Sequence, residues 1–263
     1  MGGGGAVPKS FRLGAASSAR AILAELRGER GGGTPGVIAV AGAPALVRLL
    51  AHELREGGDP SAVREGHPEQ MAGCATLVWI GEPDLDVLRN ATRHRVPIMA
   101  VTEAERMPYV FETDLVRVSP GQGFPIREIA AVLARKLGDK APALAGRLPV
   151  LRDAVVDDLI RSTARRNALL AAGITGPGVA MKVLVLAQIR LVVRIARARD
   201  RESEAAGVAG ALGVLGAGYG FRAVARRGLA RTPFGGRAVR SGIAFAGTSA
   251  IGAVARRILA RDS

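Results

Sequence analysis

The chain has 263 residues, of which 48% are hydrophobic and 3% aromatic, and this composition excludes a wholly disordered protein. Cys74 is the only cysteine, so an intramolecular disulfide scaffold is excluded and a reducing compartment such as the cytoplasm is expected. The length accommodates two ordinary domains. Because aromatics are few and there are 35 glycines, we expect a core of Ala, Val, Leu and Ile with tightly packed helices.

The formal net charge of +14 is distributed unevenly along the chain. Residues 1–146 contain 17 basic and 16 acidic side chains, whereas residues 147–263 contain 20 basic and 7 acidic ones. This asymmetry favours an anionic partner for the second half, either a phospholipid surface or a nucleic acid. The alternative is a solvated arginine-rich surface that has no partner.

The first 34 residues indicate a flexible arm around one short helix, Ser17–Arg27, without the pattern of a secretory signal. From 35 to 140, apolar runs alternate with segments of helical periodicity. This alternation predicts an α/β fold with a small parallel sheet, GTPase-like or Rossmann-like. The expected strands are 37–41, 75–80, 97–101 and 115–119, and the expected helices are 45–55, 84–95 and 126–137. The apolar face of the first helix is predicted to contain Leu46, Leu49, Leu50 and Leu54.

Ligands of an open parallel sheet bind at the carboxyl ends of the strands, so a site is expected in the turns that follow them. A phosphate-binding loop after the first strand would need Gly-x-x-x-x-Gly-Lys-Ser/Thr. The turn in this chain is Gly42-Ala-Pro-Ala-Leu-Val-Arg48. Pro44 has no amide donor and no Lys-Ser/Thr pair follows, which leaves Arg48 as the only cation of the turn.

Residues 36–138 nevertheless resemble the translation-factor-related small GTPases, notably the Era-like group. Val78-Trp-Ile-Gly-Glu-Pro-Asp84 is similar to that family's strand after the second switch. Ile98-Met-Ala-Val-Thr-Glu-Ala-Glu105 occupies the place of its guanine-reading strand. Val118-Ser-Pro-Gly-Gln-Gly-Phe124 resembles the loop behind the base, where Ser119 matches.

The same resemblance shows where this chain departs from the family. The family's base-reading motif ends Asn/Thr-Lys-x-Asp, whereas this chain has Thr102, Glu103 in place of Lys, and Glu105 in place of Asp. No Asp-x-x-Gly switch precedes Ala75. The resemblance therefore implies a degenerate domain, a pseudo-GTPase. Two alternatives are a flavodoxin-like module unrelated to GTPases and an active GTPase with an atypical phosphate loop.

Other patterns of catalysis or metal binding are weak. His52, His67 and His94 lack metal-ligand spacing and Cys74 has no adjacent partner, so no metal, cofactor or catalytic residue is expected. Asp84 is predicted to cap the helix that follows it, and Gly138 to stand where the helix 126–137 ends.

A connection with two prolines, 139–152, precedes a second region, 150–263, which is predicted to be all-α and Gly/Ala-rich. Its first helix, 152–172, should contribute Val155, Leu159, Leu169 and Leu170 to a core. The next helix, from Pro177 to about Arg201, has a basic stripe formed by Arg190, Arg194, Arg197 and Arg201. The arginines expected to meet an anionic partner are Arg190, Arg194, Arg197, Arg226, Arg227 and Arg231.

Two further segments, 205–221 and 241–255, contain no charged residue. At 1.5 Å per residue the first spans roughly 25 Å, slightly short of a bilayer core. The residues predicted to allow close packing of these helices are Gly216, Gly220, Gly247 and Gly252. Because arginines flank both segments at both ends, a re-entrant, peripheral or soluble hairpin is favoured over a spanning pair.

Residues 150–257 resemble the helical domain of unknown function 697, which in bacteria is often fused to, or encoded with, GTPase domains. The most specific match is Gly247-Thr-Ser-Ala-Ile-Gly252. Where that family has Tyr-Gly after its first long helix, this chain has Arg199-Asp200, which argues against a tight turn there. The resemblance implies association with GTPases and with membranes.

Taken together, these patterns predict a non-catalytic two-domain scaffold at the inner face of the cell membrane. Its partner would be the anionic membrane surface or a protein, including a GTPase. An RNA- or ribosome-associated factor is the first alternative, although the stacking aromatics of such proteins are nearly absent here. An active GTPase is the second.

Overall fold

The computed structural model describes residues 36–66, 73–119, 121–173, 177–204, 207 and 236–260. Several sequence predictions lie outside these residues. They are the N-terminal arm with its helix Ser17–Arg27, His67, most of the segment 205–221, Gly216, Gly220, Arg226, Arg227 and Arg231.

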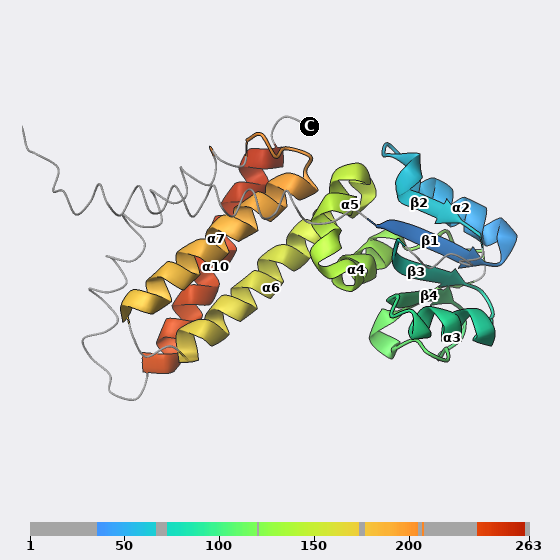
Figure 1. Ribbon diagram of the computed structural model, residues 1–263, viewed down its shortest axis with the longest axis horizontal. Coiled ribbons are helices and arrows are strands. Elements are labelled where there is room, and N and C mark those ends of the chain that lie inside the picture. Colours follow the sequence, from blue (N-terminus) through green and yellow to red (C-terminus); the bar gives the residue numbers. More distant parts are fainter. Residues whose placement is uncertain are drawn as a thin grey trace, which may run out of the picture.

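A five-stranded parallel sheet forms the first half of the molecule (Figure 1). Its strands are β1 (Val37–Gly42), β2 (Val63–Glu65), β3 (Cys74–Ile80), β4 (Ile98–Thr102) and β5 (Leu115–Arg117), in the order β2-β1-β3-β4-β5. This order is that of the flavodoxin-like doubly wound sheets. The predicted α/β class with a small parallel sheet is therefore confirmed. The edge strand β2 was missed because its three residues, Val-Arg-Glu, contain a single apolar side chain.

Helices cover both faces of the sheet. α2 (Pro44–Arg55) and α4 (Ile126–Leu137) share one apolar cluster with Ile38, Val78 and Met99, while α3 (Leu85–Arg93) packs on the opposite face with Leu77 and Trp79. The predicted face of α2 was partly wrong. Leu50 and Leu54 are buried, but Leu46 and Leu49 are exposed and Val47 and Ala51 take their places.

Among the described residues of the second half, three long helices lie alongside one another on the side of α4 and α5 away from the sheet (Figure 1). They are α6 (Arg152–Gly173), α7 (Pro177–Ala198) and α10 (Gly236–Ala260). Val155 and Leu159 of α6 are buried as predicted, but Leu169, which was also expected in the core, is 75% exposed. α10 packs mainly on α6.

The connection between the two halves is itself a packed element. It contains α5 (Ala141–Arg147) between two short 3₁₀ helices, and Leu144, Leu148 and Leu151 are completely buried. These side chains belong to one continuous apolar cluster that extends from Ile38 in β1 to Leu259 in α10. The sheet and the helical bundle therefore share one hydrophobic core.

α7 ends in a tight turn, so the expectation drawn from Arg199-Asp200 was wrong. Asp200 takes a left-handed conformation with φ of 58°, and its amide donates to the carbonyl of Arg197. The amide of Arg201 donates to the carbonyl of Ala196 at 2.8 Å. A non-glycine residue thus closes this helix by satisfying its last carbonyls.

Candidate functional site

The carboxyl edge of the sheet is the first candidate site, and its switch point lies between β1 and β3. Here the turn after β1 rests directly on the backbone of β3. The amide of Ala43 donates to the carbonyl of Ile80 at 3.0 Å, and a Cβ added to Gly42 would lie 2.0 Å from the same oxygen. Gly42 has φ of +124°, so glycine is required both by conformation and by this close approach. The main chain of this turn therefore serves to hold the turn against β3.

The positions at which a phosphate loop would stand, Gly42, Pro44 and Arg48, lie at the junction of β1 and α2. Pro44 begins α2 at its first turn, and Ala43 before it supplies no side-chain cap. Arg48 lies one turn further along α2 with its side chain exposed.

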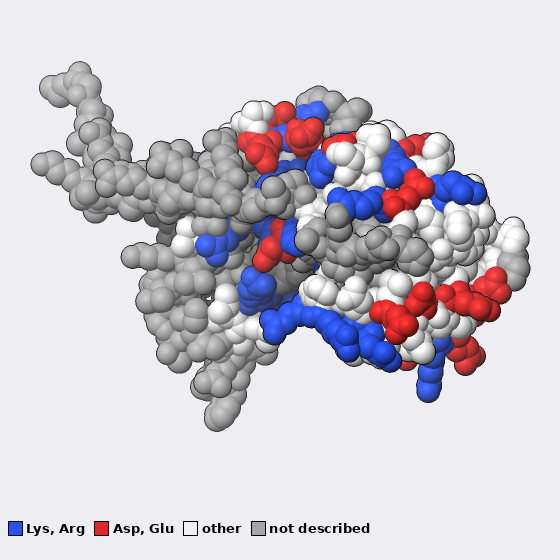
Figure 2. Space-filling view, turned by 45° about the vertical axis from the view of Figure 1, so that its right-hand side comes forward, with Lys and Arg blue, Asp and Glu red and all other residues white. Residues whose placement is uncertain are grey.

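Acidic side chains surround this edge. Glu82, Asp84 and Asp86 follow β3, and Glu103 and Glu105 follow β4, and all of these residues are exposed. Figure 2 shows a group of acidic side chains at the end of the molecule that contains the sheet, and further acidic side chains mixed with basic ones elsewhere on the same face. A local field of this sign opposes the approach of a polyphosphate.

The positions that match the base-reading motif have structural roles. Thr102 is buried, its Oγ1 accepts the amide hydrogen of Ala104 at 3.2 Å, and its carbonyl accepts from Val118. Glu105 is exposed, and Ser119 closes a turn through its carbonyl and the amide of Gln122. The structure brings Thr102 and Ser119 to neighbouring strand ends, but no hydrogen bond joins the side chains of Thr102, Glu105 and Ser119 to one another.

Two predicted local features are confirmed here. Asp84 caps α3, because its Oδ1 accepts from the amides of Asp86 and Val87 at 3.0 and 3.2 Å. Gly138 follows α4 with φ of +53°. Sequence reasoning missed the contact of Trp79, whose Nε1 donates to the carbonyl of Glu82 at 2.7 Å. The only tryptophan of the chain thus reports on the turn after β3.

Within the described part of the chain, no group of three or more His, Cys, Asp or Glu side chains could hold a metal ion. Burial raises the pKa of the Cys74 thiol, which disfavours the reactive thiolate.

Three arginines of the predicted basic stripe form ion pairs within the chain. Arg194 pairs with Asp139 at 2.9 Å, Arg197 with Glu202 at 3.2 Å, and Arg201 with Glu204 at 3.2 Å. Their side chains are 16–21% exposed, whereas Arg190 is exposed. The assignment of Arg194 and Arg197 to an anionic partner stays a prediction, and in the structure both side chains pair with carboxylates of the same chain. Their carboxylate partners already neutralise them.

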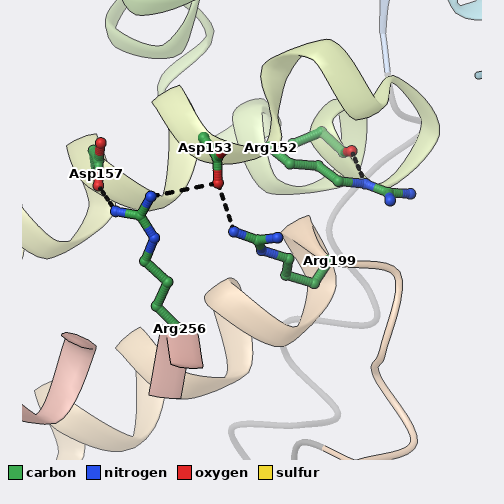
Figure 3. A network of polar contacts seen from close by, with 6 residues as sticks. Arg152, Asp153, Asp157, Arg199 and Arg256 are labelled. Carbon is green, nitrogen blue, oxygen red and sulfur yellow. Dashed lines mark hydrogen bonds and ion pairs between the residues drawn. The ribbon is translucent and has the colours of Figure 1, made fainter. Parts of the chain in front are cut away.

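A second polar network joins the ends of the three long helices (Figure 3). Asp153 of α6 accepts from Arg199, which follows α7, at 2.6 Å, and it also lies 3.6 Å from Arg256 of α10. Arg256 makes a shorter contact, 2.6 Å, with Asp157 one turn along α6. Arg152 donates to the carbonyls of Ala145 and Gly146, which ties the same turn of α6 to α5. This network could not be predicted from local sequence patterns because its members are far apart in the chain.

α10 contacts α6 at two further levels. Ile160 lies against Gly252, where an added Cβ would be 2.6 Å from Ile160 Cγ1. Asn167 Nδ2 donates to Thr248 Oγ1 at 2.9 Å, and both residues are completely buried. Since α10 residues of rising number meet α6 residues of falling number, the two helices are antiparallel. Gly252 thus lies at a close helix contact, whereas a Cβ at Gly247 would meet no described atom within 4 Å.

The outer side of α10 lacks such contacts with the part of the chain that the structure describes. Phe245, Val254 and Ile258 are each more than 40% exposed, and Ala246, Ala250 and Ala253 are exposed between them. Only 22% of the most apolar window in Ser241–Ala260 is buried. By length and composition alone, this stretch is long and apolar enough to cross a membrane. A soluble core helix of that composition would be mostly buried.

Comparisons of the chain with protein-family models, with curated proteins and with solved structures find no match. Fold and site together define a doubly wound α/β protein with a packed helical bundle, one helix of which presents an uncharged apolar face. Its function is inferred from these features alone.

Proposed function

We propose that this protein is a non-catalytic, GTPase-related scaffold that binds anionic membranes through its helical bundle. The observation that supports membrane binding is the outer face of α10. It is apolar, uncharged from Ser241 to Ala255, and exposed. Arg256 and Arg257 follow this stretch immediately, which suits an apolar segment placed against anionic headgroups.

The non-catalytic assignment is supported by the carboxyl edge of the sheet. Gly42 and Ala43 pack on β3, and Pro44 removes an amide donor. Exposed carboxylates surround the edge at which a nucleoside triphosphate would require cations. The likeness to Era-like GTPases and to the domain of unknown function 697 suggests an ancestral nucleotide domain. The parallel order of strands alone does not choose between this origin and an unrelated flavodoxin-like module.

Flotation with lipid vesicles tests membrane binding. We expect the protein to float with vesicles of phosphatidylcholine and phosphatidylglycerol, and much less with phosphatidylcholine alone. The variant Phe245→Gln/Val254→Gln/Ile258→Gln should lower the partition coefficient by about tenfold or more, because three exposed apolar side chains no longer enter the lipid.

The matched control is Leu46→Gln/Leu49→Gln, which removes exposed leucines from α2 in the other half of the chain and should leave flotation unchanged. If the protein stays in solution and elutes as a dimer that the α10 variant dissociates, a second copy occupies the face and the membrane proposal fails. Co-sedimentation with RNA but not with vesicles would also overturn it.

A labelled guanine nucleotide tests the other part of the proposal. We expect no saturable binding, no hydrolysis and no change of Trp79 fluorescence. Micromolar binding with turnover would instead establish an active GTPase with an atypical phosphate loop.

A further inference from the structure

The stretch Ser241–Ala255 of α10 is apolar all round the helix, but only one side of it packs on the helical bundle. Between Ser241 and Ala255 the chain has no charged residue, and only serines and Thr248 are polar. A helix that is apolar all round is stable where all of its sides are buried, in a large core or in lipid. In the structure the side with Thr248, Gly252 and Ala255 is buried on the bundle, and the opposite side is exposed. Packing on the bundle therefore buries one side of this apolar helix and leaves the other side exposed.

α10 and α6 form an extensive contact, and Ala255 and Leu259 on the inner side of α10 are completely buried. The polar and close-packed contacts within it are few and unevenly placed. Near the N-terminal half of α10 there is one buried hydrogen bond, between Asn167 and Thr248. In the middle there is the close approach of Gly252 to Ile160. At the C-terminal end, Arg256 pairs with Asp157 and approaches Asp153.

The ion pairs of Arg256 are open to competition. Its side chain is 39% exposed, and the side chains of Asp153 and Asp157 are 71% and 49% exposed. Exposed pairs of this kind contribute little to stability and are screened by salt. A lipid phosphate can accept the same charge-assisted, bidentate hydrogen bonds from arginine as a carboxylate does.

The buried hydrogen bond has an equivalent in lipid. A threonine hydroxyl can donate to the carbonyl one turn earlier in its own helix, so Thr248 is satisfied without Asn167. The aligned glycines and alanines of α10 also present no side chain that must stay in water.

From these observations we infer that α10 is a detachable membrane helix. Its apolar side packs on α6, the ion pairs of Arg256 with Asp153 and Asp157 act as a latch that favours this packed form, and the balance shifts toward release when anionic lipid phosphate takes Arg256. The inference rests on the proposed membrane association and specifies its regulation. In the latched form the protein presents the outer face of α10 alone. In the released form the whole uncharged stretch enters the lipid, while α6 and α7 keep their contacts with each other and with α5.

A disulfide across the α6–α10 contact tests the release. The variant Ile160→Cys/Gly252→Cys, in a Cys74→Ser background, places two thiols where an added Cβ of residue 252 would lie 2.6 Å from Ile160 Cγ1, and the smaller side chain at 160 relieves the contact. The reduced form of the same protein is the control. Reduced protein should stay on anionic vesicles through a high-salt wash, whereas the oxidised form should lose about tenfold of that salt-resistant fraction and regain it with a reductant.

Equal salt-resistant flotation of the oxidised and reduced forms would show that α10 binds without leaving α6, and would overturn the detachment while the proposed membrane function stands. Failure of both forms, and of the wild type, to float would overturn the proposed function as well. A tryptophan emission spectrum that matches that of the wild type verifies that the sheet of each variant is folded.

A second variant pair addresses the latch without altering the cation that meets the lipid. Asp153→Asn/Asp157→Asn frees Arg256 and should raise the salt-resistant fraction several-fold. Asp158→Asn is the control, since this neighbouring carboxylate makes no ion pair with a described residue. Equal behaviour of the two variants would exclude Arg256 as the latch.

Discussion

Asp59 and Arg147 contact each other through both main chain and side chain, although 88 residues separate them. The amide of Asp59 donates to the carbonyl of Arg147 at 2.8 Å, and Arg147 Nε donates to Asp59 Oδ2 at 2.9 Å. Arg147 Nη2 also donates to Ser61 Oγ at 2.8 Å. The segment that leads into the edge strand β2 is thereby fastened to the end of α5. This contact joins the sheet to the helical half at its surface.

The Asp59 carboxylate makes this contact dependent on pH. Hydrogen bonds from Ser61 and then from Arg147 lower the pKa of Asp59 from 3.8 to about 2. Because the folded pKa lies below the unfolded one, the stabilisation is complete above the unfolded value and is lost as the pH falls toward about 2. Asp59→Asn should therefore lower the urea midpoint at about pH 7 and change it less at about pH 3. The exposed Asp86→Asn is a control that should shift neither midpoint appreciably, and an equal loss for Asp59→Asn at both pH values would contradict the assignment.

Gly42 is predicted to be the most sensitive glycine of the sheet edge. Gly42→Ala combines an unfavourable φ with a Cβ placed 2.0 Å from the Ile80 carbonyl, so it should lower the free energy of unfolding by about 2–4 kcal/mol. Gly66 also has a positive φ, +103°, but an added Cβ there meets no described atom within 4 Å. Gly66→Ala should cost about 1–2 kcal/mol, from backbone strain alone. Equal losses in urea denaturation would show that the turn after β1 can move away from β3.

The buried thiol of Cys74 gives a simple measure of unfolding. Its side chain is buried at the start of β3 and its raised pKa disfavours the thiolate, so the native protein should react slowly with a disulfide reagent near neutral pH. Denaturant should increase the rate to that of a free cysteine. Fast reaction of the native protein would indicate that β3 opens locally far more readily than the rest of the sheet.

The elements that could be predicted from the sequence are those with an uninterrupted local signal. β1, β3 and β4 are buried apolar runs, and α4 begins and ends where its periodicity and Gly138 indicated. The face of α2 was misjudged because four leucines lie on the helix, yet the sheet contacts the side marked by Val47 and Ala51. Periodicity shows that a face exists, and only the position of the sheet decides which one is buried.

The polar contacts of the helical half could not be predicted in the same way. Arg256 and Asp157 are 99 residues apart, and Asn167 and Thr248 are 81 apart, so no local spacing relates them. The arginine stripe of α7 was visible in the sequence, but its partners Asp139 and Glu202 lie outside the helix. An arginine stripe therefore indicates a charged face without showing whether that face binds a partner or the chain itself.

Asn167 and Thr248 offer a direct measurement of the hold of α6 on α10 in the absence of lipid. Asn167→Leu leaves the Thr248 hydroxyl without its donor, and Thr248→Val leaves the Asn167 amide without its acceptor. Each should lower the free energy of unfolding by about 1–3 kcal/mol, the cost of a buried polar group that loses its partner. The double variant removes both polar groups at once, so its loss should be smaller than the sum of the single losses by about 1 kcal/mol or more. Urea denaturation followed by far-ultraviolet circular dichroism gives the three values. Additive losses would mean that the hydrogen bond does not couple the two helices, and that apolar packing, Gly252 and Arg256 hold α10 on α6 without it.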